Sequence, residues 1–218
     1  MIALIRYLVA AMLHSQRHYG PVLLFAGLLG SLSANDSGPL PSAYASSAAA
    51  LFVAAVWFTA ALISTQDPVQ RAITTVAAGS ARKILLATVA VAALTCVLLA
   101  MAGLAVPLVT GDHVVTGTDL LVGAEAEIAC GAAGIAIGLV CSRLVIRRLG
   151  YALASAIALM FIVLLAPGLP PVNALLRRMG AARESAQLVT PLGVYCLVAL
   201  ALLTVSVGFT HIVATRRD

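Results

Sequence analysis

Long apolar stretches joined by short polar loops constrain this chain of 218 residues more than any other feature. The hydrocarbon core of a bilayer takes about 20 helical residues to cross, so most of this sequence is long enough and apolar enough to lie in a membrane. Only 10% of the residues are charged and 62% are hydrophobic, whereas about 25% are charged in an ordinary soluble protein. The sequence therefore predicts an all-α polytopic membrane protein and excludes a water-soluble fold.

The apolar segments predict one transmembrane domain over residues 1–218 with six spans. The predicted spans cover 20–34, 44–65, 84–109, 119–142, 150–166 and 188–214. The first span is short, and a cleaved signal peptide is an alternative for it, because Leu32-Ser33-Ala34 loosely resembles a cleavage site. A five-span arrangement also stays open.

Two segments outside the spans have an amphipathic pattern. Within 1–19, a helix would place Arg6, His14, Arg17 and His18 on one side and apolar side chains on the rest, which is typical of a helix lying in the membrane interface. The segment 170–190 is not apolar enough to cross. Val172 to Met179 predict a short amphipathic helix there, capped by Gly180, at the surface or partly re-entrant.

The distribution of basic residues predicts the orientation. Six spans would put both termini on one side, and most basic residues fall on that side: Arg6, Arg17, Arg71, Arg82, Lys83, Arg143, Arg147, Arg148, Arg216 and Arg217. The positive-inside rule makes that side cytoplasmic. Arginine greatly outnumbers lysine and Ala, Gly and Val are abundant, which favours a GC-rich bacterial genome and hence a bacterial cytoplasmic membrane. The net charge of +5 reports orientation and implies no nucleic-acid partner.

Several catalytic motifs are missing from the sequence. It contains no Gly-x-x-x-x-Gly-Lys-Ser/Thr, so it lacks the loop that holds nucleotide phosphates, and it contains neither His-Glu-x-x-His nor Gly-x-Ser-x-Gly. The cysteines at 96, 130, 141 and 196 occur singly within apolar spans, which predicts core residues and no metal or redox site. We expect no enzymatic activity and no cofactor bound by this chain.

The loop 66–83, between the second and third spans, predicts a short cytoplasmic helix. Asp67 would cap it, Pro68 would occupy its first position and Gly79-Ser80 would end it, before Arg82-Lys83 mark the membrane edge.

This layout resembles the permease subunits of ABC type-2 exporters: an amphipathic interfacial helix, six spans, the helix of residues 65–83 and a broken segment between the last two spans. The resemblance implies that the helix after the second span docks into a separate ATPase subunit, which binds ATP and Mg²⁺. Carried over, the docking residues would be Asp67, Pro68, Gln70, Arg71 and Thr74. It also implies a second permease subunit, identical or homologous, and a path for a hydrophobic or amphipathic substrate such as a drug, peptide or lipid.

Two carboxylates inside the fourth span, Glu125 and Glu127, form a second candidate site. A carboxylate within a span is costly and usually faces protein or water. They are either transport-path or proton-relay groups, or buried partners of Arg177, Arg178 or Arg183. An ion-coupled secondary carrier that uses Glu127 as its proton site is therefore the alternative function. A membrane scaffold or intramembrane enzyme is a third.

Small residues in the fourth span predict close helix packing. Gly131, Gly134 and Gly138 include a Gly-x-x-x-Gly spacing, which lets two helices approach each other where lipid supplies no hydrophobic drive. The partner helix would lie within this chain or in a second copy. We expect Gly134→Leu to disturb the packing.

Overall fold

The computed structural model describes residues 1–33, 39–65, 68–110, 115–146, 148–182 and 184–216. At positions 68, 69, 71, 110 and 149 it describes the backbone only. The described residues form helices and connecting turns, with no strand. The elements are α1 (Ile2–Ser15), α2 (Tyr19–Ser33), α3 (Leu40–Ser64), α4 (Pro68–Ala78), α5 (Ala81–Thr110), α6 (Gly117–Val140), α7 (Leu149–Leu165), α8 (Val172–Ala181), the 3-10 turn η1 (Ser185–Gln187) and α9 (Val189–Thr215).

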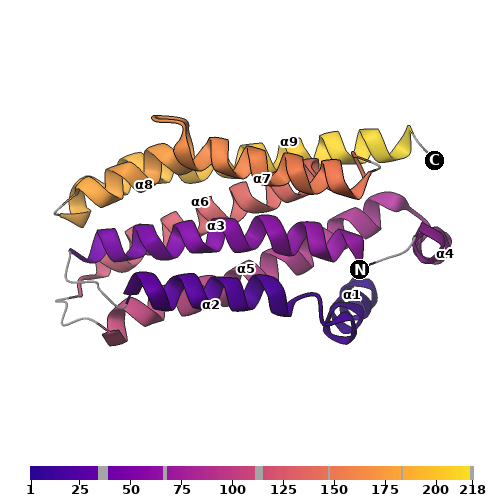
Figure 1. Ribbon diagram of the computed structural model, residues 1–218, viewed down its shortest axis with the longest axis horizontal. Helices are drawn as coiled ribbons and strands as arrows, with labels where there is room; N and C mark the ends of the chain where they lie inside the picture. The colour runs from indigo at the N-terminus through magenta and orange to yellow at the C-terminus, as the bar shows by residue number, and fades with distance from the viewer. Residues whose placement is uncertain (34–38, 66–67, 111–114, 147, 183, 217–218) are drawn as a thin grey trace.

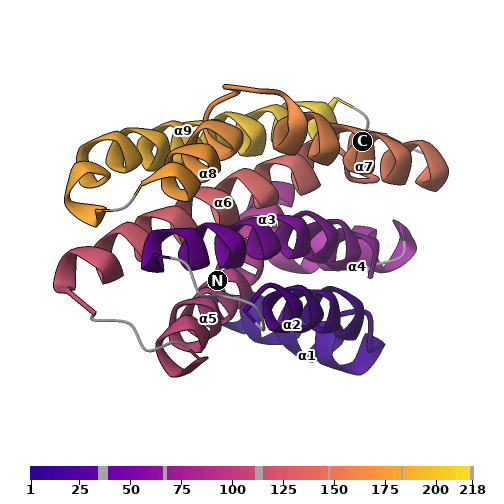
Figure 2. The same ribbon diagram turned by 60° about the vertical axis from the view of Figure 1, so that its left-hand side comes forward.

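The long helices make an elongated bundle. Helices α2, α3, α5, α6, α7 and α9 run along its long axis, and each reverses the direction of the one before it (Figure 1). Figure 2 shows the same arrangement from a second direction, with α3 and α6 in the middle of the bundle. Each of these helices begins and ends within a few residues of a predicted span, except that α3 begins at Leu40, about one turn before the predicted start.

Within the described residues, four helices are long enough and apolar enough to cross a membrane. These are α3, α5, α6 and α9, with mean hydropathies of 2.0, 2.7, 1.7 and 2.3. Helices α2 and α7 have 15 and 17 residues, below the roughly 20 that a perpendicular span needs. The chain is therefore a membrane protein.

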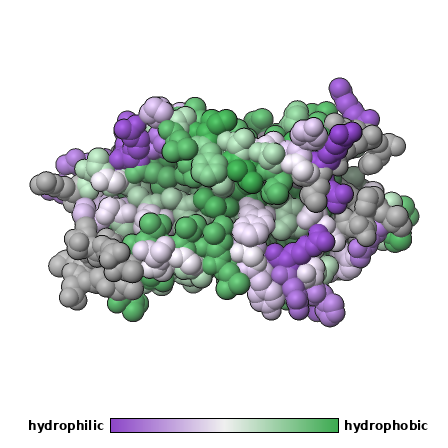
Figure 3. Space-filling model, viewed as in Figure 1, coloured by the Kyte–Doolittle hydropathy of each residue, from purple (hydrophilic) through white to green (hydrophobic). Residues whose placement is uncertain are grey.

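The outer surface agrees with a lipid environment. Figure 3 shows a broad apolar belt around the middle of the visible face, with hydrophilic residues gathered toward the two ends of the bundle. Large apolar side chains such as Met101 on α5, Phe161 on α7 and Val205 on α9 are exposed. A water-soluble monomer rarely exposes a continuous apolar surface of this extent, whereas lipid tails solvate it at no cost.

The core of the bundle is the contact between α3 and α6. On α6, 72% of the most apolar stretch of 18 residues is buried inside the bundle, whereas on α9 the corresponding share is 17%. A Cβ atom added at Gly134 would lie 2.7 Å from Ala55 Cβ and 2.8 Å from the Phe52 carbonyl oxygen. One at Gly138 would lie 2.6 Å from Thr59 Cβ. These glycines therefore let the α6 backbone touch α3, within this chain, as the spacing predicted.

Gly131 is less tightly packed than the other two glycines. A Cβ atom there would meet Cys96 and Leu51 at 3.6 Å, which is ordinary van der Waals distance. Gly131 therefore faces both α3 and α5 but does not force their approach.

Helices α1 and α4 cross the bundle axis at one end. Both are seen nearly end-on in Figure 1, at the end where the chain termini lie. Helix α4 begins at Pro68, as predicted, and ends at Ala78 because Gly79 takes a left-handed φ of 71° that stops the helix. The predicted cap Asp67 lies outside the described residues.

Helix α8 occupies the opposite end of the bundle (Figure 1). The predicted amphipathic helix is present, but Gly180 is not its cap, because the helix continues to Ala181 and its C-cap is Ala182. Val172, Leu175 and Met179 are fully buried in the same core cluster as α3 and α6. Residues 172–181 therefore belong to the packed bundle and are not a loose surface segment.

Candidate functional site

Glu127 lies at the meeting point of α3, α5 and α6. Its side chain is only 1% exposed. One carboxylate oxygen, Oε1, accepts a hydrogen bond of 2.6 Å from the Ser47 hydroxyl on α3. The other, Oε2, is buried and has no hydrogen-bond partner among the described residues. A buried polar atom without a hydrogen-bond partner lowers the stability of the folded state, so Oε2 of Glu127 destabilises the fold where it lies.

Gly103 on α5 makes room for this carboxylate. A Cβ atom at Gly103 would lie 2.6 Å from Glu127 Oε1. A side chain at that position would therefore force either the carboxylate or the α5 backbone to move. Sequence reasoning found Glu127 but missed Ser47 and Gly103, because neither residue type is unusual in an apolar span.

Glu125 faces a different helix. Its Oε1 would lie 3.7 Å from a Cβ atom at Gly193 on α9, and its Oε2 is buried with no hydrogen-bond partner among the described residues. The two carboxylates are two positions apart on α6, so they point to different neighbours.

The arginines of α8 do not neutralise these carboxylates. Within the part of the chain that the structure describes, neither Arg177 nor Arg178 hydrogen-bonds to Glu125 or Glu127. Both arginines are exposed, and the Arg178 guanidinium lies 5.6 Å from the centre of the Tyr195 ring, a cation–π contact with α9. Arg183 lies outside the described residues.

Asp119 holds η1 and the segment after α8 to the bundle. Its carboxylate accepts hydrogen bonds from the Thr116 backbone N–H at 2.8 Å and the Thr116 hydroxyl at 2.6 Å, and another from the Ser185 hydroxyl in η1. The first contact is part of the capping box at the start of α6. The third joins that cap to η1.

The surface at the other end of the bundle is a groove between α1 and α4. Its volume is about 570 Å³. It is lined by Met1, Ala3, Leu4, Tyr7, Ile73, Thr74, Ala77, Ala78 and Lys83. An exposed hydrogen bond joins the two helices across it, from Gln70 Nε2 to Tyr7 Oη, at 3.1 Å.

The predicted docking residues differ in their exposure and in their contacts. Gln70 is exposed and bonds to Tyr7, while the Thr74 hydroxyl donates to the Gln70 carbonyl of its own helix at 2.7 Å. Pro68 and Arg71 lie on α4, where the structure describes their backbone only. Two strongly exposed apolar residues of α4, Ile73 at 66% and Val76 at 84%, were missed as candidates.

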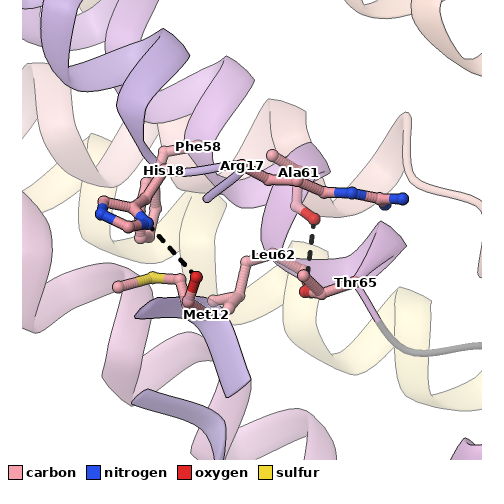
Figure 4. Close-up of a pocket in the computed structure, with 7 residues that line it drawn as sticks. All are labelled: Met12, Arg17, His18, Phe58, Ala61, Leu62 and Thr65. Carbon is pink, nitrogen blue, oxygen red and sulfur yellow. Dashed lines mark hydrogen bonds between the residues drawn. The ribbon is translucent and has the colours of Figure 1, made fainter. Parts of the chain in front are cut away.

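A set of contacts ties this end of the bundle to α3. Figure 4 shows Arg17 and His18, from the turn between α1 and α2, beside the last turns of α3. The Arg17 guanidinium donates to the Ser64 carbonyl at 2.7 Å, and the His18 ring is within 3.2 Å of the Met12 carbonyl. A cation at the carboxyl end of a helix also interacts favourably with the helix dipole. The contact links α1 to α3 just before the chain enters α4.

The comparisons with known proteins give no relative: no protein-family model, no curated protein and no solved structure matches this chain. In the described residues, no three His, Cys, Asp or Glu side chains gather as a metal site would require. Cys96, Cys130, Cys141 and Cys196 are free thiols.

Proposed function

We propose that this chain is the membrane permease subunit of an ATP-driven exporter, with ATP hydrolysed on a separate subunit docked against α1 and α4. It would sit in a bacterial cytoplasmic membrane, with α2 and α7 completing six spans and both termini cytoplasmic. Two permease subunits, identical or homologous, would form the path for a hydrophobic or amphipathic substrate.

The observation that carries this proposal is the pairing of α1 and α4 at one end of the bundle (Figure 1). They lie across the ends of the long helices and enclose an open groove whose lining is mostly apolar. Ile73 and Val76 expose apolar side chains at a polar end of the molecule, and Lys83 lines the groove together with Ile73. An apolar groove with a basic edge suits a protein partner better than it suits water.

A docked partner needs a mechanical route into the spans. The Arg17 contact with Ser64 fixes the turn that follows α1 to the end of α3, and α4 is followed at once by α5. A partner that moves α1 and α4 together would therefore tilt α3 and α5 as rigid levers.

The test is copurification of the tagged chain from its native host in a mild detergent. We expect wild type to bring down an ATP-binding subunit with ATPase activity. Ile73→Asp and Arg71→Glu should weaken that association, whereas Leu169→Asp, an exposed apolar residue in the α7–α8 connection, should leave it unchanged. Unchanged association in both α4 variants would remove α4 as the dock.

Glu127 supports a second candidate function, an ion-coupled carrier. A carboxylate buried among three helices, with one oxygen that has no hydrogen-bond partner among the described residues, is suited to exchange a proton when those helices part. Transport that survives loss of every associated ATPase but fails in Glu127→Gln would favour the carrier. Transport that requires the ATPase would favour the exporter.

A further inference from the structure

The arginines of α8 lie at the end of the bundle opposite to α1 and α4, where α9 also begins (Figure 1). Arg177 and Arg178 are both exposed, and both project from the side of α8 that faces away from its buried residues. Two neighbouring cations on one surface create a local positive potential that attracts an anion.

None of the carboxylates that the structure describes is that anion. Asp119 and Glu127 accept hydrogen bonds from neighbouring hydroxyls, and Glu184 accepts one from a neighbouring side-chain amide. Glu125 faces α9 and has no hydrogen bond to either arginine. An anion that pairs with these arginines therefore comes from outside the described residues.

Arg178 is already held in place by α9. Its guanidinium carbon lies 5.6 Å from the centre of the half-buried Tyr195 ring. A cation over an aromatic face is attracted to it. A guanidinium in this position keeps N–H groups free at its edge, and that edge can donate two parallel hydrogen bonds to the oxygens of one phosphate.

An exposed apolar stripe begins at the same ring. Val198, Leu202 and Val205 follow Tyr195 along one flank of α9, and all three are exposed. From Tyr195 to Val205 the helix axis rises by about 15 Å. This is about half of the hydrocarbon thickness of a bilayer, so the stripe matches the depth of one leaflet.

From this juxtaposition we infer that Arg178 and the flank of α9 bind an anionic phospholipid. The phosphate pairs with the Arg178 guanidinium above the Tyr195 ring, and one acyl chain lies along the stripe of Val198, Leu202 and Val205. A free phosphate ion would use the guanidinium but not the stripe, whereas a lipid uses both. The inference needs only the membrane location, so it holds for an exporter and for a carrier alike.

A net negative lipid fits this site better than a zwitterionic one. The choline of phosphatidylcholine carries a positive charge beside its own phosphate, so its attraction to a basic surface is weak. Phosphatidylglycerol has no such charge, and a basic residue near the membrane surface attracts anionic lipid. The headgroup is therefore expected to be an anionic phosphodiester.

The test is contact quenching, by brominated lipids, of a tryptophan placed at position 195. Tyr195→Trp keeps an aromatic face under the guanidinium, and Trp57→Phe removes the single native tryptophan. The double variant is placed in phosphatidylcholine vesicles that contain an equal fraction of either brominated phosphatidylglycerol or brominated phosphatidylcholine. We expect the quenching to show a preference for phosphatidylglycerol of at least about threefold.

Two further variants in this background locate the site. Arg178→Gln should bring the preference close to one. Arg177→Gln removes the same charge from the neighbouring position but not the group above the ring, so it should keep most of the preference. A tryptophan at position 209 instead, from Phe209→Trp, lies farther along α9 at an exposed position, and its quenching should not respond to Arg178→Gln in a folded chain.

Several results would overturn the inference. These are equal quenching by the two lipids, an unchanged preference in Arg178→Gln, and an equal loss in Arg177→Gln, which would indicate a general surface potential. Inorganic phosphate added at constant ionic strength should leave the preference unchanged. If it removes the preference, the arginine binds a free anion and not a lipid.

Arg178→Lys keeps the inference testable if Arg178→Gln does not fold. Lysine retains the charge but lacks the planar fork that binds two phosphate oxygens, so the preference should fall at least about twofold. A preference equal to that of the parent chain would overturn the assignment of Arg178. The assay contains no ATPase, so the docking proposal and this one fail independently.

Discussion

The contact between α3 and α6 and the contact between α1 and α4 are two opposite kinds of helix pairing. The first has glycines at backbone distance and a buried hydrogen bond from Ser47 to Glu127. The second has, among the described side chains, an exposed hydrogen bond from Gln70 to Tyr7 over an open groove. In the α3–α6 contact, atoms of this chain fill the space between the two helices. The second leaves apolar surface exposed at a polar end of the molecule.

This difference separates the part of the molecule that sustains the fold from the part available to a partner. In the α3–α6 contact, an added atom would clash, and a removed atom would leave a void or an unpaired polar group. Removing an atom from the α1–α4 contact only lets solvent replace it, and this changes the free energy of unfolding little. Stability and association should therefore respond to different substitutions.

The largest effect on stability should come from Gly134→Ala. The added Cβ atom would meet Ala55 Cβ at 2.7 Å and the Phe52 carbonyl oxygen at 2.8 Å, so the two backbones must separate. Overpacking of this kind costs about 1–3 kcal/mol. Gly27→Ala on α2 is the control, because nothing lies within 4 Å of that position. Thermal unfolding of both variants in one detergent measures the difference, and equal midpoints would contradict the close approach.

Ser47→Ala should come next. It removes the only described hydrogen bond to Glu127 and leaves the whole carboxylate unpaired, at a cost of about 1–3 kcal/mol. Ser46→Ala is the matched control, since the Ser46 hydroxyl donates only to the Ala43 carbonyl of its own helix among the described residues. The same unfolding assay applies. A Ser46 variant less stable than the Ser47 variant would show that the buried pair contributes little.

Tyr7→Phe should have a smaller effect on unfolding. It deletes the acceptor of the exposed hydrogen bond between α4 and α1, and an exposed contact of this kind changes the free energy of unfolding by about 0.5 kcal/mol or less. We expect amide hydrogen exchange to rise in α1 and α4 while it stays unchanged in α3 and α6. Faster exchange spread over all four helices would mean that the α1–α4 contact supports the core.

Val76→Asp should have the smallest effect of the four. The side chain is 84% exposed and does not line the groove, so the free energy of unfolding should change by no more than about 0.5 kcal/mol. A shift of the unfolding midpoint as large as that of Ser47→Ala would show that α4 is packed more firmly than its exposure indicates.

Much of the fold followed from local sequence. Long apolar runs must form helices in lipid, because only a helix satisfies its backbone polar groups within one segment. Pro68 and Gly79 bounded α4 correctly, since one presets the helical φ and the other readily adopts a left-handed φ. Gly180 misled the prediction for α8, because burial of Met179 against the core keeps that helix intact beyond it.

The candidate sites were harder to predict. Glu125 and Glu127 were conspicuous because carboxylates are rare in spans, but pairing with Arg177 or Arg178 is absent from the described structure. Ser47 and Gly103 carry no local signal, since serine and glycine are common in membrane helices. They matter only because the fold brings residues 47, 103 and 127 together.

The sequence by itself determined that this is a helical membrane protein, where its main helices lie, and that α6 carries costly carboxylates. Hydropathy and helix signals act over neighbouring residues, so they can be read along the chain. Only the tertiary structure decided that Glu127 faces Ser47 and not an arginine, that α8 packs into the bundle, and that α1 and α4 share a groove. Those outcomes depend on which helix faces meet, and helix rotation and pairing are set by packing across the whole bundle.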